Sequence, residues 1–245
     1  MPRNSASPLA AVVRITRATS PGWLPFLVCA CLAAPAVAGY VTVREDGNTS
    51  IATGAHCELR FTRAGGGLWL TGASLGGQEA LRGASVIWSA EFRDSEGRRA
   101  LLHGGMGEAT AREAEIWPAV GPYDAVEGVE LRWTGLELSG GGRPRVTVRV
   151  EMLGDLCWRI LFDDIPEDWT LFRYTFPILS LAAEDGDACA LIEPNDWGTI
   201  TPDPLRNLEA IRRAYPSSSA CMQFYALQRG ERVTYLGCHD PTSRL

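Results

Sequence analysis

The chain contains no lysine, so all 23 of its basic residues are arginine, against 29 aspartate and glutamate residues. These arginines are scattered singly or in pairs along the chain. A protein that binds nucleic acid or an anionic membrane needs clustered positive charge, which this distribution lacks. The acidic balance therefore predicts no nucleic-acid partner.

Several motifs of enzyme chemistry are also missing. The sequence has no Cys-x-x-Cys pair, no glycine-rich phosphate loop, no serine nucleophile elbow and no zinc-binding helix motif. No metal and no cofactor are therefore expected, and the sequence gives no reason to assign a catalytic residue to this chain.

A hydrophobic run long enough to cross a bilayer is lacking as well. The longest apolar stretch, Leu24 to Ala38, has 15 residues, fewer than the roughly 20 that a membrane-spanning helix needs. Arginines precede it and Ala36-Val37-Ala38 ends it, which is the pattern of a secretory signal. We therefore predict a signal peptide over residues 1–38, a mature domain over residues 39–245, no membrane span, and a secreted or periplasmic location.

Cysteine is too sparse for a dense disulfide framework. The cysteines after the predicted leader are widely spaced and odd in number, so most are expected to be buried apolar side chains. Cys221 and Cys238 lie on the two arms of a predicted hairpin and would pair only if their register matches. The mature cysteines are Cys57, Cys157, Cys189, Cys221 and Cys238.

No long amphipathic helix is visible, and short strands punctuated by Gly, Pro and Asp fill the chain instead. Alternation is clearest in His56–Thr62, Val129–Trp133 and Val146–Met152. Gly107–Glu115 is rich in Ala and Glu, so propensity alone favours a helix there. The pattern as a whole predicts an all-β, antiparallel sandwich.

The stretch Tyr215–Pro241 reads as a β-hairpin with a polar turn at Arg229-Gly230-Glu231-Arg232. Its Tyr-Pro, Met-Gln-Phe, Tyr-Leu-Gly and His-Asp-Pro segments, in that order, resemble the signature hairpin of an uncharacterised glycoside-hydrolase-like family. The resemblance implies a galactose-mutarotase-like β-supersandwich, incomplete at its C-terminus, that is the non-catalytic N-terminal part of a secreted glycoside hydrolase. In that family the sandwich packs on a catalytic barrel of the same full-length chain and lends a loop to its substrate cleft.

Asn195, Asp196 and Trp197 form the candidate carbohydrate-binding loop, because sugars stack on aromatic faces and amides or carboxylates bind their hydroxyls. A structural turn with a core tryptophan is the competing interpretation. His239 and Asp240 form a second candidate, either as a polar pair at the mouth of the sandwich or as a cap at the end of the hairpin.

Two other functions stay open at this point. One is a free-standing secreted carbohydrate-binding module. The other is an aldose epimerase, which needs a histidine and a carboxylate on opposite sides of a sugar. The histidines available are His56, His103 and His239. The acidic segment 163–168 is better interpreted as a solvated turn than as a pair of glycosidase carboxylates, which must flank the scissile bond.

Overall fold

The structure is a computed structural model, and it describes residues 13–19, 41–116, 126–152, 156–180, 189–193, 199–204, 224–230 and 232–238. About 70% of these residues are β-strand and 1% are helix, and every strand pairing among them is antiparallel. The all-β antiparallel sandwich predicted from the sequence is confirmed.

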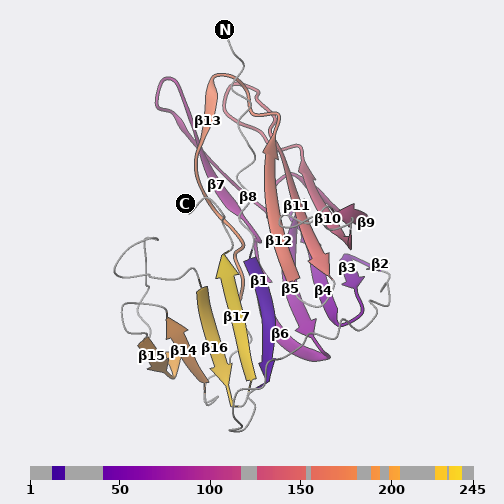
Figure 1. The fold of residues 1–245 in the computed structure, drawn as a ribbon. Helices are drawn as coiled ribbons and strands as arrows, with labels where there is room; N and C mark the ends of the chain where they lie inside the picture. Colours follow the sequence, from indigo (N-terminus) through magenta and orange to yellow (C-terminus); the bar gives the residue numbers. More distant parts are fainter. Residues whose placement is uncertain are drawn as a thin grey trace.

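The described strands form three sheets (Figure 1). The largest has the order β15-β14-β16-β17-β1-β12-β11-β10-β9, a second has the order β2-β3-β4-β5-β6, and a third has the order β13-β7-β8. The strands of the large sheet are β1 (Val13–Thr19), β9 (Glu108–Ile116), β10 (Val126–Thr134), β11 (Arg145–Met152), β12 (Leu156–Asp163), β14 (Cys189–Glu193), β15 (Thr199–Pro202), β16 (Phe224–Arg229) and β17 (Arg232–Cys238). The smaller sheets comprise β2 (Thr42–Asp46), β3 (Thr49–Thr53), β4 (Cys57–Ala64), β5 (Gly67–Leu75), β6 (Gln78–Ser85), β7 (Ser89–Asp94), β8 (Arg99–His103) and β13 (Trp169–Thr175).

Alternating side chains build the core between the large sheet and the two smaller ones. In β4, Cys57, Leu59 and Phe61 are buried, as the sequence pattern predicted. Val129, Leu131 and Trp133 of β10 are fully buried and belong to the same core cluster. Apolar residues at every second position place one face of each strand inside, which is what holds the layers together.

Aromatic rings join the β13-β7-β8 sheet to the large sheet. Trp88 packs edge-on against Trp133 with ring centroids 5.7 Å apart, and also against Phe162 at 6.2 Å. Phe92 of β7 meets Phe162 of β12 in another edge-to-face contact. Such pairs contribute about 0.5 to 1.5 kcal/mol beyond the burial of their surface, so they help to fix how the sheets pack.

The predicted hairpin forms from β16 and β17, with Arg229 opposite Arg232 and Gly230 in the left-handed region at φ +57°. Its buried residues Ala226 and Leu227, like Cys189 of β14, lie outside the main core cluster. In Figure 1 this part of the large sheet extends away from the strands that pack on the two smaller sheets. Cys221 lies outside the described residues, so its pairing with Cys238 stays a prediction.

The helix that composition favoured over Gly107–Glu115 is wrong, because these residues form β9 at the edge of the large sheet. Nine consecutive residue pairs join β9 to β10, from Val126 opposite Ile116 to Thr134 opposite Glu108. Pairing with a strongly patterned neighbour overrides the weak helix preference of Ala and Glu, which amounts to only tenths of a kcal/mol per residue.

The predicted leader overlaps a strand. Residues 13–19, which contain two of the arginines assigned to the leader, form β1 between β12 and β17. Seven residues of β1 pair with β17 and three pair with β12. The apolar run of the predicted leader, residues 24–38, lies outside the described part of the chain. No helix among the described residues has the length and apolar character needed to cross a membrane.

Candidate functional site

The candidate loop containing Asn195, Asp196 and Trp197 lies outside the described residues, as do His239 and Asp240. The strands that precede them are described. β14 and β17 both pair antiparallel with β16, so they run in the same direction. The strands before the two candidate segments therefore finish at the same end of the large sheet. The binding roles of the candidate residues themselves stay predictions.

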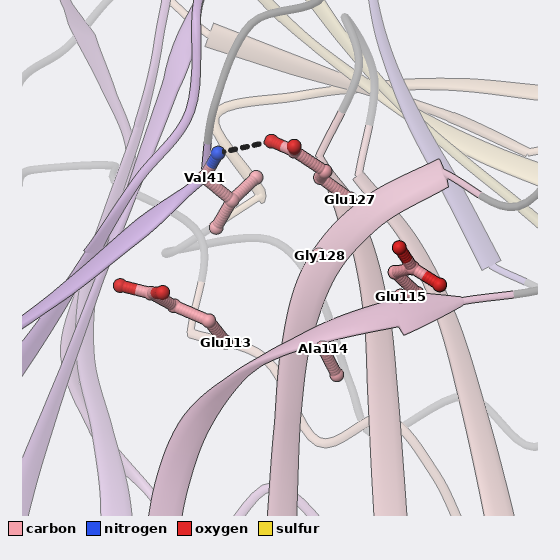
Figure 2. A pocket seen from close by; sticks show the side chains of 6 residues that line it. All are labelled: Val41, Glu113, Ala114, Glu115, Glu127 and Gly128. Atoms are coloured by element: carbon pink, nitrogen blue, oxygen red, sulfur yellow. Dashed lines mark hydrogen bonds between the residues drawn. The ribbon is translucent and has the colours of Figure 1, made fainter.

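The described residues contain a pocket that the sequence did not predict, located where β9 and β10 pass the start of β2 (Figure 2). Its volume is about 290 Å³, and it is lined by Val41, Glu113, Ala114, Glu115, Glu127 and Gly128. This volume is at the lower end of the range of small-ligand sites.

The carboxylates of the pocket occupy positions of the inner sandwich face. Glu127 precedes Val129 by two residues and so lies on the same face of β10 as that buried valine. Across the strand pair, Glu113 lies opposite Val129 and Glu115 lies opposite Glu127. The inner face therefore changes from apolar to acidic toward this end of the sandwich.

Two of these carboxylates fasten the start of β2. Glu127 Oε2 accepts a 2.7 Å hydrogen bond from the amide of Val41, and Glu113 Oε1 accepts one of 2.9 Å from the amide of Val43. β2 is an edge strand, so these amides face away from its partner β3 or lie at its end. The glutamates thus accept hydrogen bonds from backbone amides at a sheet edge, where a neighbouring strand would otherwise accept them.

Glu115 differs from the other two glutamates, since it makes no hydrogen bond or ion pair with any residue in the described part of the chain. Figure 2 shows its carboxylate farther from Val41 than those of Glu113 and Glu127. Gly128 forms the floor nearby, where an added Cβ would lie 2.2 Å from the carbonyl oxygen of Val150 and 2.4 Å from Cδ1 of Ile116. Only glycine fits there, which keeps the strands closely packed beneath the pocket.

Two buried glutamates on the outer faces of the sheets are each surrounded by three arginines. Glu130 of β10 pairs with Arg112, Arg132 and Arg149, all at 3.0 Å or less. Burial raises the pKa of Glu130, but hydrogen bonds from Arg112 and Arg149 outweigh it and hold the pKa below its ordinary value.

The second arginine cluster centres on Glu91 of β7, with Arg93, Arg99 and Arg173 around it. The hydrogen bond from Arg99 lowers the pKa of Glu91 to about 2, against the opposing effect of burial, and Arg93 adds to the lowering. Glu91 is therefore ionised throughout the physiological range.

The described residues do not assemble an epimerase pair or a metal site. His103 Nδ1 accepts a hydrogen bond from the amide of Gly105, and neither His103 nor His56 contacts a carboxylate within the described ranges. Nor do the described residues include a group of three or more His, Cys, Asp or Glu placed to hold a metal ion. Asp163 and Asp164 are exposed, with Arg145 within 4 Å of each, so the solvated-turn interpretation is confirmed.

No protein-family model, no curated protein and no solved structure matches this chain.

Sequence reasoning missed the pocket because it placed Glu113 and Glu115 on a helix. A usable signal was present in β10, where Glu127 continues the alternation of Val129, Leu131 and Trp133 with a charged residue. A carboxylate at a position that the pattern assigns to the inner face indicates either an open end of the sandwich or a site. Arg-Glu clusters such as that of Glu91 join strands distant in sequence, and no local pattern indicates them.

Proposed function

We propose that this chain is a non-catalytic, carbohydrate-associated domain of a secreted glycoside hydrolase. In this proposal the catalytic carboxylates belong to a barrel domain beyond Leu245, and the sandwich packs on that barrel and contributes a loop to its cleft. The proposal rests on the resemblance of the C-terminal hairpin, and the all-β antiparallel fold agrees with it.

The observation that carries the carbohydrate part is the acidic pocket. Carboxylates that accept hydrogen bonds from neighbouring hydroxyls are a common means of binding sugars. Glu115 offers both of its oxygens, whereas Glu113 and Glu127 each use one oxygen, on the backbone amides of Val43 and Val41, and have a second available. The pocket thus offers several acceptors that are held in place by strands rather than by loops.

The part of the large sheet beyond β1 supports packing against another domain. Ile200 of β15, which is the outermost described strand at that end of the large sheet, is 65% exposed. An exposed apolar side chain on the outermost described strand of a sheet suits contact with a further protein layer.

A free-standing carbohydrate-binding module is the second candidate. It is favoured by the continuous core that joins all three sheets, because such a core can fold as an independent unit. An aldose epimerase has less support, since neither described histidine lies against a carboxylate.

Isothermal titration of the 245-residue chain with a panel of neutral and acidic oligosaccharides tests the proposal. We expect binding that weakens about tenfold in Glu115→Gln, the loss of one charge-assisted hydrogen bond. Glu108→Gln is the matched control, because Glu108 lies on the same strand, is exposed and does not line the pocket. Trp197→Ala tests the predicted loop in the same assay.

The outcomes separate the two sites. If Trp197→Ala abolishes binding and Glu115→Gln leaves it intact, the sugar binds at the loop and the pocket has only a structural role. If no oligosaccharide binds at all, the carbohydrate part of the proposal is wrong.

A further inference from the structure

The outer face of the β13-β7-β8 sheet carries a cluster of charged side chains. Glu91 has only 3% of its side chain exposed although it points away from the core. Its Oε1 accepts hydrogen bonds from Arg93 Nε at 2.9 Å and Arg99 Nε at 2.7 Å, while Arg173 Nε lies 2.9 Å from Oε2. One buried carboxylate thus gathers three guanidinium groups from three adjacent strands.

All three arginines contact Glu91 through Nε. The terminal nitrogens of these guanidinium groups donate no hydrogen bond to Glu91 or to any other described residue. Their side chains are 38%, 61% and 66% exposed for Arg93, Arg99 and Arg173. The terminal nitrogens of arginine form the planar fork that binds a carboxylate in bidentate fashion, so this face presents three such forks to solvent.

Apolar side chains lie among the forks. Leu101, opposite Glu91 in β8, is 65% exposed, and Phe172, at the bulge of β13, is 52% exposed. The guanidinium carbon of Arg93 lies 3.3 Å from the centroid of the Phe172 ring. This cation–π contact holds the ring in place on the surface. On this face, positively charged guanidinium groups therefore lie next to exposed apolar side chains.

The cluster around Glu130 differs in both respects. Arg112 uses Nε and Nη2 together on Glu130, and Arg132 uses Nη2, so these two forks are turned toward their own carboxylate; Arg149 donates through Nε alone. None of the exposed large apolar residues of the described chain lies on β9, β10 or β11. The Glu130 cluster is therefore a useful comparison: it also has one glutamate and three arginines, but its guanidinium groups are oriented differently.

We propose that the Arg93, Arg99, Arg173, Phe172 and Leu101 face binds an acidic polysaccharide whose sugar rings carry carboxylates. The choice of a carbohydrate rests on the proposed function. Carboxylates along such a chain match the exposed guanidinium forks, and the apolar faces of the rings match Phe172 and Leu101. The protein as a whole has a net charge of −6, whereas this face has a local excess of positive charge from three arginines around one glutamate.

Binding of polygalacturonate to the 245-residue chain, measured by affinity electrophoresis and by biolayer interferometry, tests the proposal. We expect polygalacturonate to bind, neutral galactan to bind more weakly at this face, and raised salt to weaken the polygalacturonate complex. Arg99→Gln/Arg173→Gln should weaken polygalacturonate binding tenfold or more, since two charge-assisted contacts are lost. Phe172→Ala should weaken it less.

Arg112→Gln/Arg149→Gln is the matched control, because it removes two arginines from the Glu130 cluster and therefore lowers the net charge by the same two units. Thermal melting of each variant verifies folding before the affinities are compared. Equal affinity of Arg99→Gln/Arg173→Gln and wild type would overturn the proposal, as would equal losses in that variant and in Arg112→Gln/Arg149→Gln.

Two further probes separate this inference from the function on which it rests. Polyglutamate binding as tightly as polygalacturonate would overturn a carbohydrate ligand and indicate an acidic protein segment. Binding of neutral sugars without polygalacturonate would overturn the inference and leave the proposed function standing. If no carbohydrate binds, both this inference and the carbohydrate part of the proposed function are wrong.

Discussion

Glu91 lies under three arginine side chains on a sheet face that would otherwise be open to solvent. Burying a carboxylate is costly unless its charge is compensated, and Arg93, Arg99 and Arg173 compensate it: the first two donate hydrogen bonds to Oε1, and Arg173 forms an ion pair with Oε2. Because Glu91 holds the guanidinium groups through Nε, it is a positioning residue for the forks. Its substitution should therefore change stability and ligand binding together.

The titration of Glu91 predicts how stability depends on pH. Its folded-state pKa of about 2 is below the ordinary value of 4.5, so its contribution is complete above pH 4.5 and is lost as the pH falls toward 2. Glu45, Asp94 and Glu130 have pKa values lowered in the same direction. We expect the midpoint of thermal unfolding to fall across this window.

Glu91→Gln should reduce the slope of that decline and lower the melting temperature at pH 7. The neutral amide leaves three guanidinium groups close together without a countercharge. Circular dichroism melts between pH 2.5 and 7 measure both effects. If the melting temperature of Glu91→Gln changes with pH as steeply as that of wild type, Glu91 is not the source of the pH dependence.

Gly128 should not tolerate a side chain. Gly128→Ala places a methyl group against the Val150 carbonyl and Ile116, and we expect a loss of about 1 to 3 kcal/mol in the free energy of unfolding. Gly72→Ala is the control, because the nearest atom to an added Cβ there lies 3.7 Å away. Urea denaturation of both variants makes the comparison, and equal stabilities would contradict the packing beneath the pocket.

At the scale of elements, β2 depends on carboxylates from the opposite layer. Glu127→Ala removes the acceptor of the Val41 amide, and we expect a loss of about 1 kcal/mol in stability. Hydrogen exchange of residues 41–46 should also become faster than in wild type. Glu115→Ala is the control, since Glu115 does not hold β2; equally fast exchange in both variants would contradict the anchoring role of Glu127.

The strands show which elements can be predicted from sequence. β4, β10 and β11 were predicted because apolar and polar residues alternate along them, and the burial of Leu59, Leu131 and Val148 follows that alternation. β9 was not predicted, because its Ala and Glu residues carry no strand preference and its structure depends on pairing with β10. The acidic pocket depends on that same pairing: the charged position of Glu127 in β10 was visible in the sequence, but Glu113 and Glu115 join it only because β9 pairs with β10.

At the scale of the whole molecule, the large sheet depends on β1. Removal of residues 1–38 as a leader would take β1 out and separate β17 from β12, leaving each with an open edge. Open strand edges promote association. We therefore expect residues 39–245, produced alone, to form oligomers or aggregates in size-exclusion chromatography, while the 245-residue chain serves as the control.

A cooperative, monomeric melt of residues 39–245 would contradict that expectation. It would also favour a free-standing carbohydrate-binding module over a domain that needs a partner. Mass spectrometry of the exported protein complements this test, because we expect its first residue to be Gly39. A first residue before Val13 would instead retain β1 in the sheet and contradict the predicted leader.

We propose that this sandwich belongs to a larger secreted glycoside hydrolase whose catalytic residues lie in another domain. Sequencing the gene past the codon for Leu245 is the decisive measurement. We predict an open reading frame that continues into a barrel-length segment of alternating strands and helices. A stop codon immediately after Leu245 would contradict the claim, and the sandwich would then have to act alone.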